Sequence, residues 1–298
     1  MKTTLIRRDF TGMGCPCSVK VEHADARIAH AAILAAMTEV VRLDCKYSHF
    51  RDDSLLAVWG GSAGSGRQFE VDNESAGLFD LAALLHAQSG GLFDITAGAL
   101  TRLWDRPQLT LPDAADIAAA RARVGWEHVY WRRPQLRLDL PGLRLDLGGL
   151  VKEYAADRAA QACIEAGIEA GVVELGGDVH VIGPHLDGSL WRIGIRHPRA
   201  DGALARIDIG SGGLATSGDY ERALVVDGRR YSHIVDPRSG WPIQSYASVS
   251  VRADSCLTAG AAATLAMLLG VQAGTGYLRE LGLPHLTVDL DGVVGGNL

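Results

Sequence analysis

The sequence predicts an α+β fold in one continuous unit that covers residues 1–298. Stretches with helical periodicity alternate irregularly with short strand-like stretches, whereas a doubly wound parallel sheet needs a regular alternation. The second half is rich in strand-like stretches separated by Asp-Gly pairs, which are typical of tight turns. No change in composition, low-complexity linker or internal repeat divides the chain. The Asp-Gly pairs begin at Asp187, Asp201, Asp227 and Asp291.

Three helices around a glycine-rich loop are predicted in the first half. Residues 26–46 repeat apolar side chains at helical spacing. Residues 54–66 end in a run of glycine and serine, which is typical of a flexible loop. The second and third helices are predicted over residues 74–88, which end before a Gly-Gly pair, and over the Ala-rich residues 113–123.

A β-hairpin is predicted near the middle of the chain. Leucine alternates with polar residues over residues 136–140 and 143–147, on either side of a Pro-Gly pair. These patterns favour mixed or antiparallel sheets flanked by helices. The remaining predicted elements are a helix over residues 150–166, strands over 172–175 and 179–182, helices over 258–269 and 274–281, and a final strand pair around 291–292.

Composition argues against several classes of protein. The chain has 29 Lys+Arg against 35 Asp+Glu and no basic cluster, so a nucleic-acid-binding surface is disfavoured. No apolar run reaches the roughly 18 residues of a transmembrane helix. The five cysteines are scattered, which disfavours a disulfide framework and fits a reducing compartment. The N-terminal residues lack the apolar core of a secretory signal.

Residues 146–152 read DLGGLVK and combine the features of an anion-binding turn. A predicted strand ends in Asp146, two glycines let a ligand approach the backbone, and a helix begins with Lys152 in its first turn. The N–H groups of a helix N-terminus and a nearby cation attract phosphate. An ordinary strand–turn–helix with a capping Asp and a surface Lys has the same pattern, so both interpretations stay open.

Other predicted turns carry polar side chains that suit the same kind of ligand. Residues 91–96 read GLFDIT, residues 176–178 read GGD and residues 216–220 read TSGDY. His233 precedes Asp236 and a Pro-led turn, and the ordinary pKa of histidine suits a general base. Each segment alone is also typical of a structural turn. Together they favour a phosphate-bearing ligand and a divalent cation, and composition and spacing go no further.

The order of these segments resembles the ApbE family of FAD:protein FMN transferases. The resemblance implies a single ApbE-like, T-fold-like unit. It also implies cleavage of the FAD pyrophosphate with Mg²⁺, attachment of FMN through a phosphoester to a Thr or Ser of an acceptor flavoprotein, and release of AMP. The segments that carry the resemblance are Met13-Gly14, residues 91–96, 146–152, 176–178, 216–220 and 233–242, and the helix that ends near Thr264.

Matching positions imply roles for particular residues. Phe50 stands where the family often has Tyr, which keeps a ring for stacking but loses a phenol hydrogen bond. Lys152 is expected near the phosphates, the Gly149 carbonyl is expected to bind the metal, and His233 is the candidate base for the acceptor hydroxyl. The residues expected to hold FAD are Met13, Phe50, Leu92, Phe93, Asp94, Asp146, Lys152 and Ile234.

The sequence departs from the family at the metal-binding helix. This helix usually reads ADALAT in the family, with the acid and the hydroxyl one turn apart, whereas residues 259–264 read AGAAAT. Thr264 is retained as an expected ligand, but Gly260 replaces the acid. Because Mg²⁺ prefers oxygen ligands and keeps several waters, the loss of one carboxylate weakens such a site without necessarily abolishing it. Asp254 and Asp219 are candidates to compensate.

Three alternatives to the active transferase remain. The first is an FAD-binding relative that lost transfer with the change at Gly260. The second is a Mg²⁺-dependent FAD pyrophosphatase, with water as acceptor, that gives FMN and AMP. A serine hydrolase built on Ser62 is the weakest, because no helix is predicted after its G-x-S-x-G segment. The lack of a signal peptide and lipobox cysteine predicts a cytoplasmic protein unless a leader has been removed.

Overall fold

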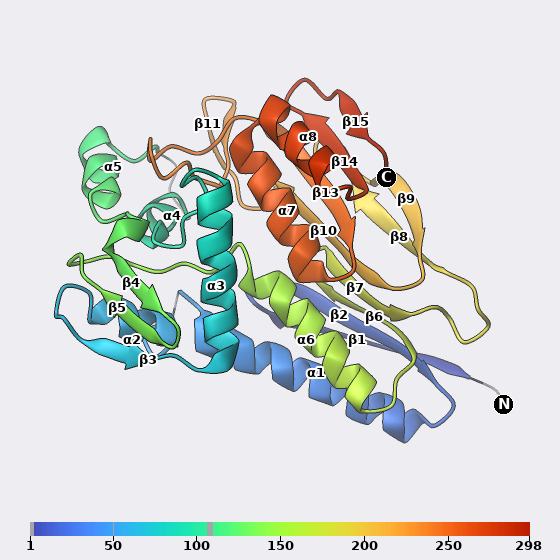
Figure 1. Cartoon of the computed structure of the whole chain (residues 1–298). Helices are drawn as coiled ribbons and strands as arrows, with labels where there is room; N and C mark the ends of the chain where they lie inside the picture. Colours follow the sequence, from blue (N-terminus) through green and yellow to red (C-terminus); the bar gives the residue numbers. More distant parts are fainter. Residues whose placement is uncertain (1–2, 50, 106–109) are drawn as a thin grey trace.

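The structure is a computed structural model that describes residues 3–49, 51–105 and 110–298. Its main feature is an eight-stranded sheet in which all neighbouring strands are antiparallel (Figure 1). The predicted α+β class with antiparallel sheets is therefore confirmed. In spatial order the strands are β1 (Thr4–Gly12), β2 (Cys15–His23), β6 (Ala170–Leu175), β7 (Asp178–Gly183), β10 (Gly212–Gly218), β13 (Tyr246–Ala253), β14 (His285–Asp289) and β15 (Val294–Gly296).

Three helices cover one face of this sheet. The helices α1 (Ala26–Tyr47), α6 (Val151–Glu165) and α7 (Cys256–Leu269) lie over the strands, and α8 (Val271–Glu280) follows α7 (Figure 1). Each presents apolar side chains at helical spacing to the core. Most core residues of α7 are alanine, so its backbone approaches the sheet and α6 closely.

The opposite face of the sheet is covered by a hairpin. Neighbouring strand residues point to opposite faces, so Val173 packs in the helix-covered core while Val172 packs with Trp191 and Ile209 of the hairpin. This hairpin consists of β8 (Trp191–Arg196) and β9 (Ala203–Ile209). The main sheet is therefore buried on both faces near its centre.

A smaller region packs against one end of the main sheet and lies on the left in Figure 1. It contains a three-stranded antiparallel sheet in the order β3-β5-β4. Its elements are α2 (Leu55–Gly61), β3 (Gln68–Glu70), α3 (Asn73–Gln88), α4 (Gly98–Trp104), α5 (Ala114–Arg121), the 3₁₀ turn Trp126–His128, β4 (Val129–Arg132) and β5 (Gln135–Leu138), joined later in the chain by the β-hairpin of β11 (Leu224–Val226) and β12 (Arg229–Tyr231).

Two predictions for the smaller region were wrong. Residues 54–66 are not simply a loop, because Ser54 caps a helix over Leu55–Gly61 through its hydroxyl. The predicted hairpin does not form either, because β5 pairs with β3 and β4 instead. Residues 143–147 form only an isolated bridge, at Arg144, yet Leu143, Leu145 and Leu147 are buried. The alternation of leucine with polar residues thus predicted correctly which side chains are buried, but not which strands pair with β5.

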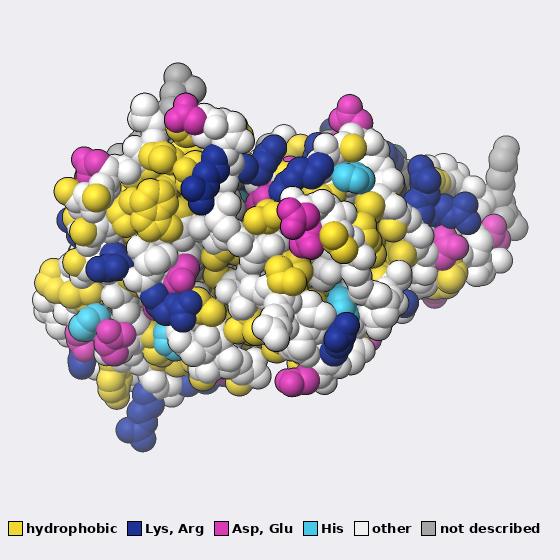
Figure 2. Space-filling view, turned by 90° about the horizontal axis from the view of Figure 1, so that it is seen from above, with side chains coloured by type: hydrophobic (Ala, Val, Ile, Leu, Met, Phe, Trp, Pro, Cys, Tyr) yellow, Lys and Arg dark blue, Asp and Glu magenta, His cyan; other side chains and the backbone are white. Residues whose placement is uncertain are grey.

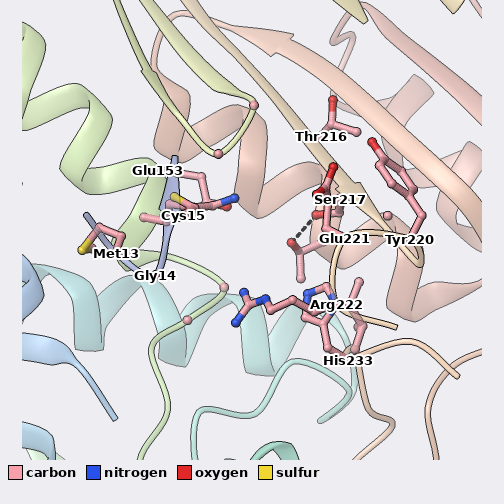
Figure 3. Close-up of a pocket in the computed structure, with 18 of the residues that line it drawn as sticks. Met13, Gly14, Cys15, Glu153, Thr216, Ser217, Tyr220, Glu221, Arg222 and His233 are labelled. Carbon is pink, nitrogen blue, oxygen red and sulfur yellow. Dashed lines mark hydrogen bonds between the residues drawn. The ribbon is translucent and has the colours of Figure 1, made fainter. Parts of the chain in front are cut away.

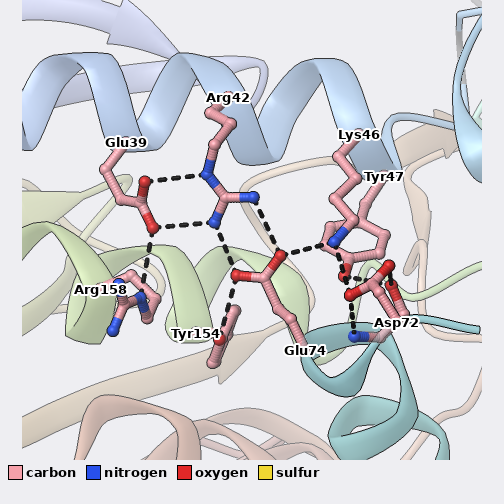
Figure 4. A network of polar contacts seen from close by, with 9 residues as sticks. Glu39, Arg42, Lys46, Tyr47, Asp72, Glu74, Tyr154 and Arg158 are labelled. Carbon is pink, nitrogen blue, oxygen red and sulfur yellow. Dashed lines mark hydrogen bonds and ion pairs between the residues drawn. The ribbon is translucent and has the colours of Figure 1, made fainter.

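A charged network ties α1 to α3 and α6 (Figure 4). The guanidinium of Arg42 donates to Glu39 and Glu74, with a shortest distance of 2.6 Å to Glu74. Lys46 donates to the same Glu74 carboxylate at 2.7 Å. Arg158 of α6 reaches Glu39 at 3.2 Å. Every charged group named here has an opposite partner, so the network fixes the three helices relative to one another.

Figure 2 shows acidic and basic side chains interspersed over one face of the molecule. Hydrophobic side chains gather over the half that contains α4 and α5, beside Lys and Arg side chains. This face therefore carries no broad surface of one sign, in line with the composition. None of the helices in the described residues combines the length and hydropathy needed to span a bilayer.

Candidate functional site

A cavity of about 760 Å³ opens where the main sheet meets the smaller region (Figure 3). This volume lies within the usual range for a small-molecule site. Nearly all the predicted site residues face it although they come from distant parts of the chain; Gly260 does not, and Phe50 lies outside the described residues. Those that line the cavity are Met13, Leu92, Phe93, Asp94, Asp146, Gly149, Lys152, His233, Ile234 and Thr264.

Two adjacent hairpin turns form one wall of the cavity. Met13 and Gly14 join β1 to β2 with positive φ angles of 53° and 69°, as the two central residues of a type I′ hairpin turn require. Gly176 and Gly177 join β6 to β7 in the same way. A Cβ on Gly176 would lie 2.8 Å from Cys15 Sγ, so only glycine allows the turns to pack together. The Met13 side chain is thereby presented at the cavity.

The loop after α3 forms a second wall. Asp94 Oδ1 accepts hydrogen bonds from the backbone N–H and hydroxyl of Thr96, at 2.8 and 2.7 Å. Asp94 therefore fixes its own loop, and its Oδ2 lies 3.9 Å from His86 Nδ1. Phe93 is buried over Gly149, where a Cβ would lie 3.3 Å from the ring. This close packing sets the backbone of residues 148–149 against the cavity.

Asp146 is held as a carboxylate by three groups. It accepts hydrogen bonds from Gly148 N at 2.7 Å and Thr101 Oγ1 at 2.6 Å, and it pairs with His49 Nδ1 at 3.4 Å. Burial raises the pKa of Asp146, but His49 outweighs this and holds the pKa well below its usual range. Burial lowers the pKa of His49, yet Asp105 and Asp146 raise it to about 9. Sequence reasoning missed His49.

A charged cluster lies at the start of α6. Lys152 Nζ pairs with Asp178 Oδ2 at 2.6 Å. The neighbouring Glu153 is 5% exposed, and its Oε2 has no hydrogen-bond partner in the described structure. Burial, followed by the charge of Asp178, raises the pKa of Glu153 to about 7. Sequence reasoning also missed Glu153, although an acid in line with the apolar Ala156 and Ala160 on one helical face was a signal.

Two hydroxyl groups meet in the cavity wall next to Gly149. Ser217 Oγ of β10 and Thr264 Oγ1 of α7 lie 2.6 Å apart in a hydrogen bond. The Thr264 methyl group would be 3.8 Å from a Cβ on Gly149. Oxygen donors of this kind suit a hard divalent cation. Within the described residues, however, no group of three or more His, Cys, Asp or Glu side chains could hold a metal by itself.

His233 reaches the cavity from the opposite side (Figure 3). Burial, then the charges of Arg222 and Lys152, lowers the pKa of His233 to about 4. Its Nδ1 is buried and has no hydrogen-bond partner in the described structure. The ring is therefore neutral at pH 7 and can accept a proton. The neighbouring Ile234 has both backbone groups engaged, with Ser232 Oγ and Ile243 N, which limits its backbone contacts to a ligand.

The two acids suggested as replacements at the metal site do not reach it. Asp219 accepts two hydrogen bonds from Arg199, both at 2.6 Å, and Asp254 is exposed. Neither lines the cavity. Instead, the side chain of Glu153 packs directly against Gly260. Ser62 is equally remote, since its hydroxyl donates to the Trp59 carbonyl at the end of α2.

Comparisons with known proteins agree with this arrangement. FAD:protein FMN transferases of Salmonella typhimurium and Klebsiella pneumoniae are each 33% identical to the chain, covering 94% and 86% of it and 83% and 79% of their own lengths. The ApbE protein of Thermotoga maritima has a TM-score of 0.88 at 30% identity, covering 99% of this chain and 97% of that chain. Flavin transferase ApbE from Vibrio cholerae has a TM-score of 0.83 at 30% identity, covering 99% and 98%. Residues 13–287 match the ApbE family, and the chain belongs to that family.

Proposed function

We propose that this protein is an FAD:protein FMN transferase that cleaves FAD, attaches FMN by a phosphoester bond to a Thr or Ser of an acceptor flavoprotein, and releases AMP. One observation supports this most directly. A cation, a neutral histidine and oxygen donors converge on one cavity large enough for a nucleotide. The similar FAD:protein FMN transferases support the same activity. In this proposal, residues 1–298 act as one transferase domain.

The cavity walls are proposed to hold the two halves of FAD. Met13, Leu92 and Phe93 offer apolar surface for ring contacts. Lys152 is proposed to lie beside the pyrophosphate, because its ammonium lines the cavity next to its ion pair with Asp178 and carries three donor hydrogens. Asp146 accepts hydrogen bonds from Gly148 N and from Thr101 of α4, and so keeps residues 148–149 in place.

The donor set fits Mg²⁺, which we include in the proposal. The Thr264 hydroxyl and the Gly149 carbonyl supply hard oxygens, and a buried carboxylate oxygen of Glu153 lacks a partner. Mg²⁺ sites typically combine one or two carboxylates with substrate phosphates. When bound, the cation would neutralise charge on the pyrophosphate during transfer.

His233 is proposed as the base that takes the proton from the acceptor hydroxyl. It is neutral at physiological pH, and its unpartnered Nδ1 is free to accept a hydrogen bond. The hydroxyl oxygen then attacks the FMN phosphorus, the bond to the AMP phosphate breaks, and AMP leaves. Positioning and charge neutralisation supply most of the rate in reactions of this class.

The test combines the purified protein with FAD and an acceptor protein, with Mg²⁺ or with EDTA. In-gel flavin fluorescence and AMP release are read together, and the control acceptor has its target Thr or Ser replaced by Ala. Labelled acceptor and AMP, both dependent on Mg²⁺, are expected. AMP without label even from a competent acceptor would favour the pyrophosphatase, and bound FAD with neither product would favour a flavin-binding relative.

A further inference from the structure

Glu153 occupies the space that a side chain at position 260 would fill. Gly260 of α7 faces α6, and a Cβ built on it would lie 2.9 Å from Glu153 Oε1 and in still closer contact with Cγ. Real Cβ atoms do not approach other atoms so closely, so any larger residue at 260 would displace the Glu153 side chain. The two positions therefore share one space between the helices.

The Glu153 carboxylate is buried with one oxygen unpaired. Its side chain is almost completely buried, and Oε2 accepts no hydrogen bond in the described structure. The adjacent cation, Lys152, already pairs with Asp178 at 2.6 Å. Glu153 therefore has no cation of its own in direct contact, although the charges of Lys152 and Arg222 act on it from within the cavity. A buried carboxylate without a partner is costly, which indicates that a further positive group belongs beside Glu153.

The surroundings of Glu153 offer the other ligands that a hard cation needs. Glu153, in the first turn of α6, and Gly149, two residues before this helix begins, both line the cavity. Thr264 follows Gly260 by one turn of α7 and so lies on the same helical face. Its hydroxyl is already placed at the cavity by Ser217. The Glu153 carboxylate of α6, the Thr264 hydroxyl of α7 and the backbone of Gly149 before α6 therefore line one cavity.

We propose that Glu153 supplies the carboxylate ligand of the Mg²⁺ site, reaching from α6 into the position that a side chain on α7 at residue 260 would otherwise occupy. This inference rests on the proposed function, because it requires the metal. The longer side chain of glutamate, compared with aspartate, spans the gap between the helices. The carboxylate ligand can then come from either position 153 or position 260. In this chain it comes from Glu153, and glycine at position 260 leaves the room that the Glu153 side chain needs.

The direct test measures Mn²⁺ binding, with Mn²⁺ as a paramagnetic substitute for Mg²⁺. Protein saturated with FAD, without acceptor, is titrated while electron paramagnetic resonance follows the free ion, and chromatography verifies that FAD remains intact. Glu153→Gln keeps the shape and removes the charge, so the dissociation constant for Mn²⁺ should rise by about 10–100-fold or more. The matched control is Glu165→Gln, at the exposed end of the same helix, which should bind Mn²⁺ normally.

A second variant moves the carboxylate to the other helix. Glu153→Gly combined with Gly260→Asp clears the shared space and places an acid on α7. This double variant should recover most of the Mn²⁺ affinity that Glu153→Gln loses. Thermal unfolding and FAD affinity measured without metal verify that each variant folds and keeps its cavity.

The outcomes separate the two proposals. If the wild-type protein with FAD binds no Mn²⁺, the metal requirement of the proposed function fails. If the wild type binds Mn²⁺ and Glu153→Gln binds it equally well, the assignment of Glu153 fails while the proposed function stands. A double variant that folds and binds FAD but stays unable to bind Mn²⁺ contradicts the equivalence of the two positions.

Discussion

The charged network between α1, α3 and α6 and the charged cluster in the cavity contain similar residues. They differ in how many of their polar atoms have a partner within the protein. In the network, Arg42 and Lys46 converge on Glu74, so each charge meets an opposite one (Figure 4). In the cavity, Glu153 Oε2 and His233 Nδ1 are buried and have no hydrogen-bond partner in the described structure.

This difference separates groups that hold the fold from groups that await a ligand. A buried polar atom without a partner costs free energy, so native proteins seldom retain one without a reason. The network groups satisfy one another and need nothing further. The cavity groups can complete their contacts only with something that enters the cavity. Substitutions in the two places should therefore have opposite effects on stability and on activity.

The largest effect is expected at His233. Replacing the proposed base, His233→Ala, should slow transfer to the acceptor by about 10²–10⁴-fold while FAD affinity stays near that of the wild type. The melting temperature should not fall much, because the substitution removes a buried nitrogen that has no partner. The measurement is the initial rate of acceptor labelling at saturating FAD. An unchanged rate would remove His233 from the mechanism.

Substitution of Lys152 should change both stability and FAD binding, because its side chain lines the cavity and also pairs with Asp178. Lys152→Ala leaves the buried Asp178 carboxylate unpaired, which should lower the free energy of unfolding by about 3 kcal/mol. It should also weaken FAD binding through the loss of a phosphate contact. Chemical denaturation and flavin fluorescence titration measure the two effects.

The control for Lys152 adds Asp178→Asn to the same chain. This second change removes the unpaired charge, so stability should recover in large part while FAD affinity stays low. Recovery of both properties would mean that Lys152 only balances Asp178.

Glu74 should show the smallest effect, confined to stability. Burial raises the pKa of Glu74, but Arg42 and Lys46 outweigh it and lower the pKa to about 2. A lowered pKa adds stability above the unfolded pKa near 4.5, and this stability is lost as the pH falls toward 2. Glu74→Gln should therefore cost about 1–2 kcal/mol at pH 7, allowing for partial exposure, and almost nothing near pH 2.

Urea unfolding between pH 2 and 7 measures this dependence. The exposed Glu280 provides a control, since Glu280→Gln should leave the curve unchanged across the range. Transfer activity at pH 7 should be unaffected by Glu74→Gln. A difference between variant and wild type that is independent of pH would contradict the ion-pair explanation.

Much of the fold could be predicted from local patterns. The helix over Ala26–Tyr47 and the turn at Gly176-Gly177 follow from apolar spacing and from glycine conformation, which depend only on neighbouring residues. The hairpin predicted over residues 136–147 did not form because both edges of β5 are taken by other strands, the preceding β4 and the distant β3. Leu136 pairs with the distant Phe69 on one side, and on the other with Trp131, in a hairpin that turns before residue 136 and not after it.

Only part of the candidate site could be predicted from the sequence, because the site also depends on contacts between distant segments. Lys152 and His233 stand in recognisable segments, and both line the cavity. The relation between Glu153 and Gly260 could not be seen, because it exists only where α6 packs on α7. From the sequence alone, Gly260 of α7 indicates the loss of an acidic side chain. The structure shows that the side chain of Glu153, from α6, fills the space beside it.

The sheet order also governs when the cavity can exist during folding. β2 pairs with β6, so Cys17 lies opposite Leu175, and the wall containing Met13 is complete only after most of the intervening chain has been synthesised. Thr264, on the other side, comes later still. Such distant pairings carry a large loop-closure cost and form slowly. A ligand of this cavity can therefore meet all of its walls only after residues as far along the chain as Thr264 have been synthesised and packed.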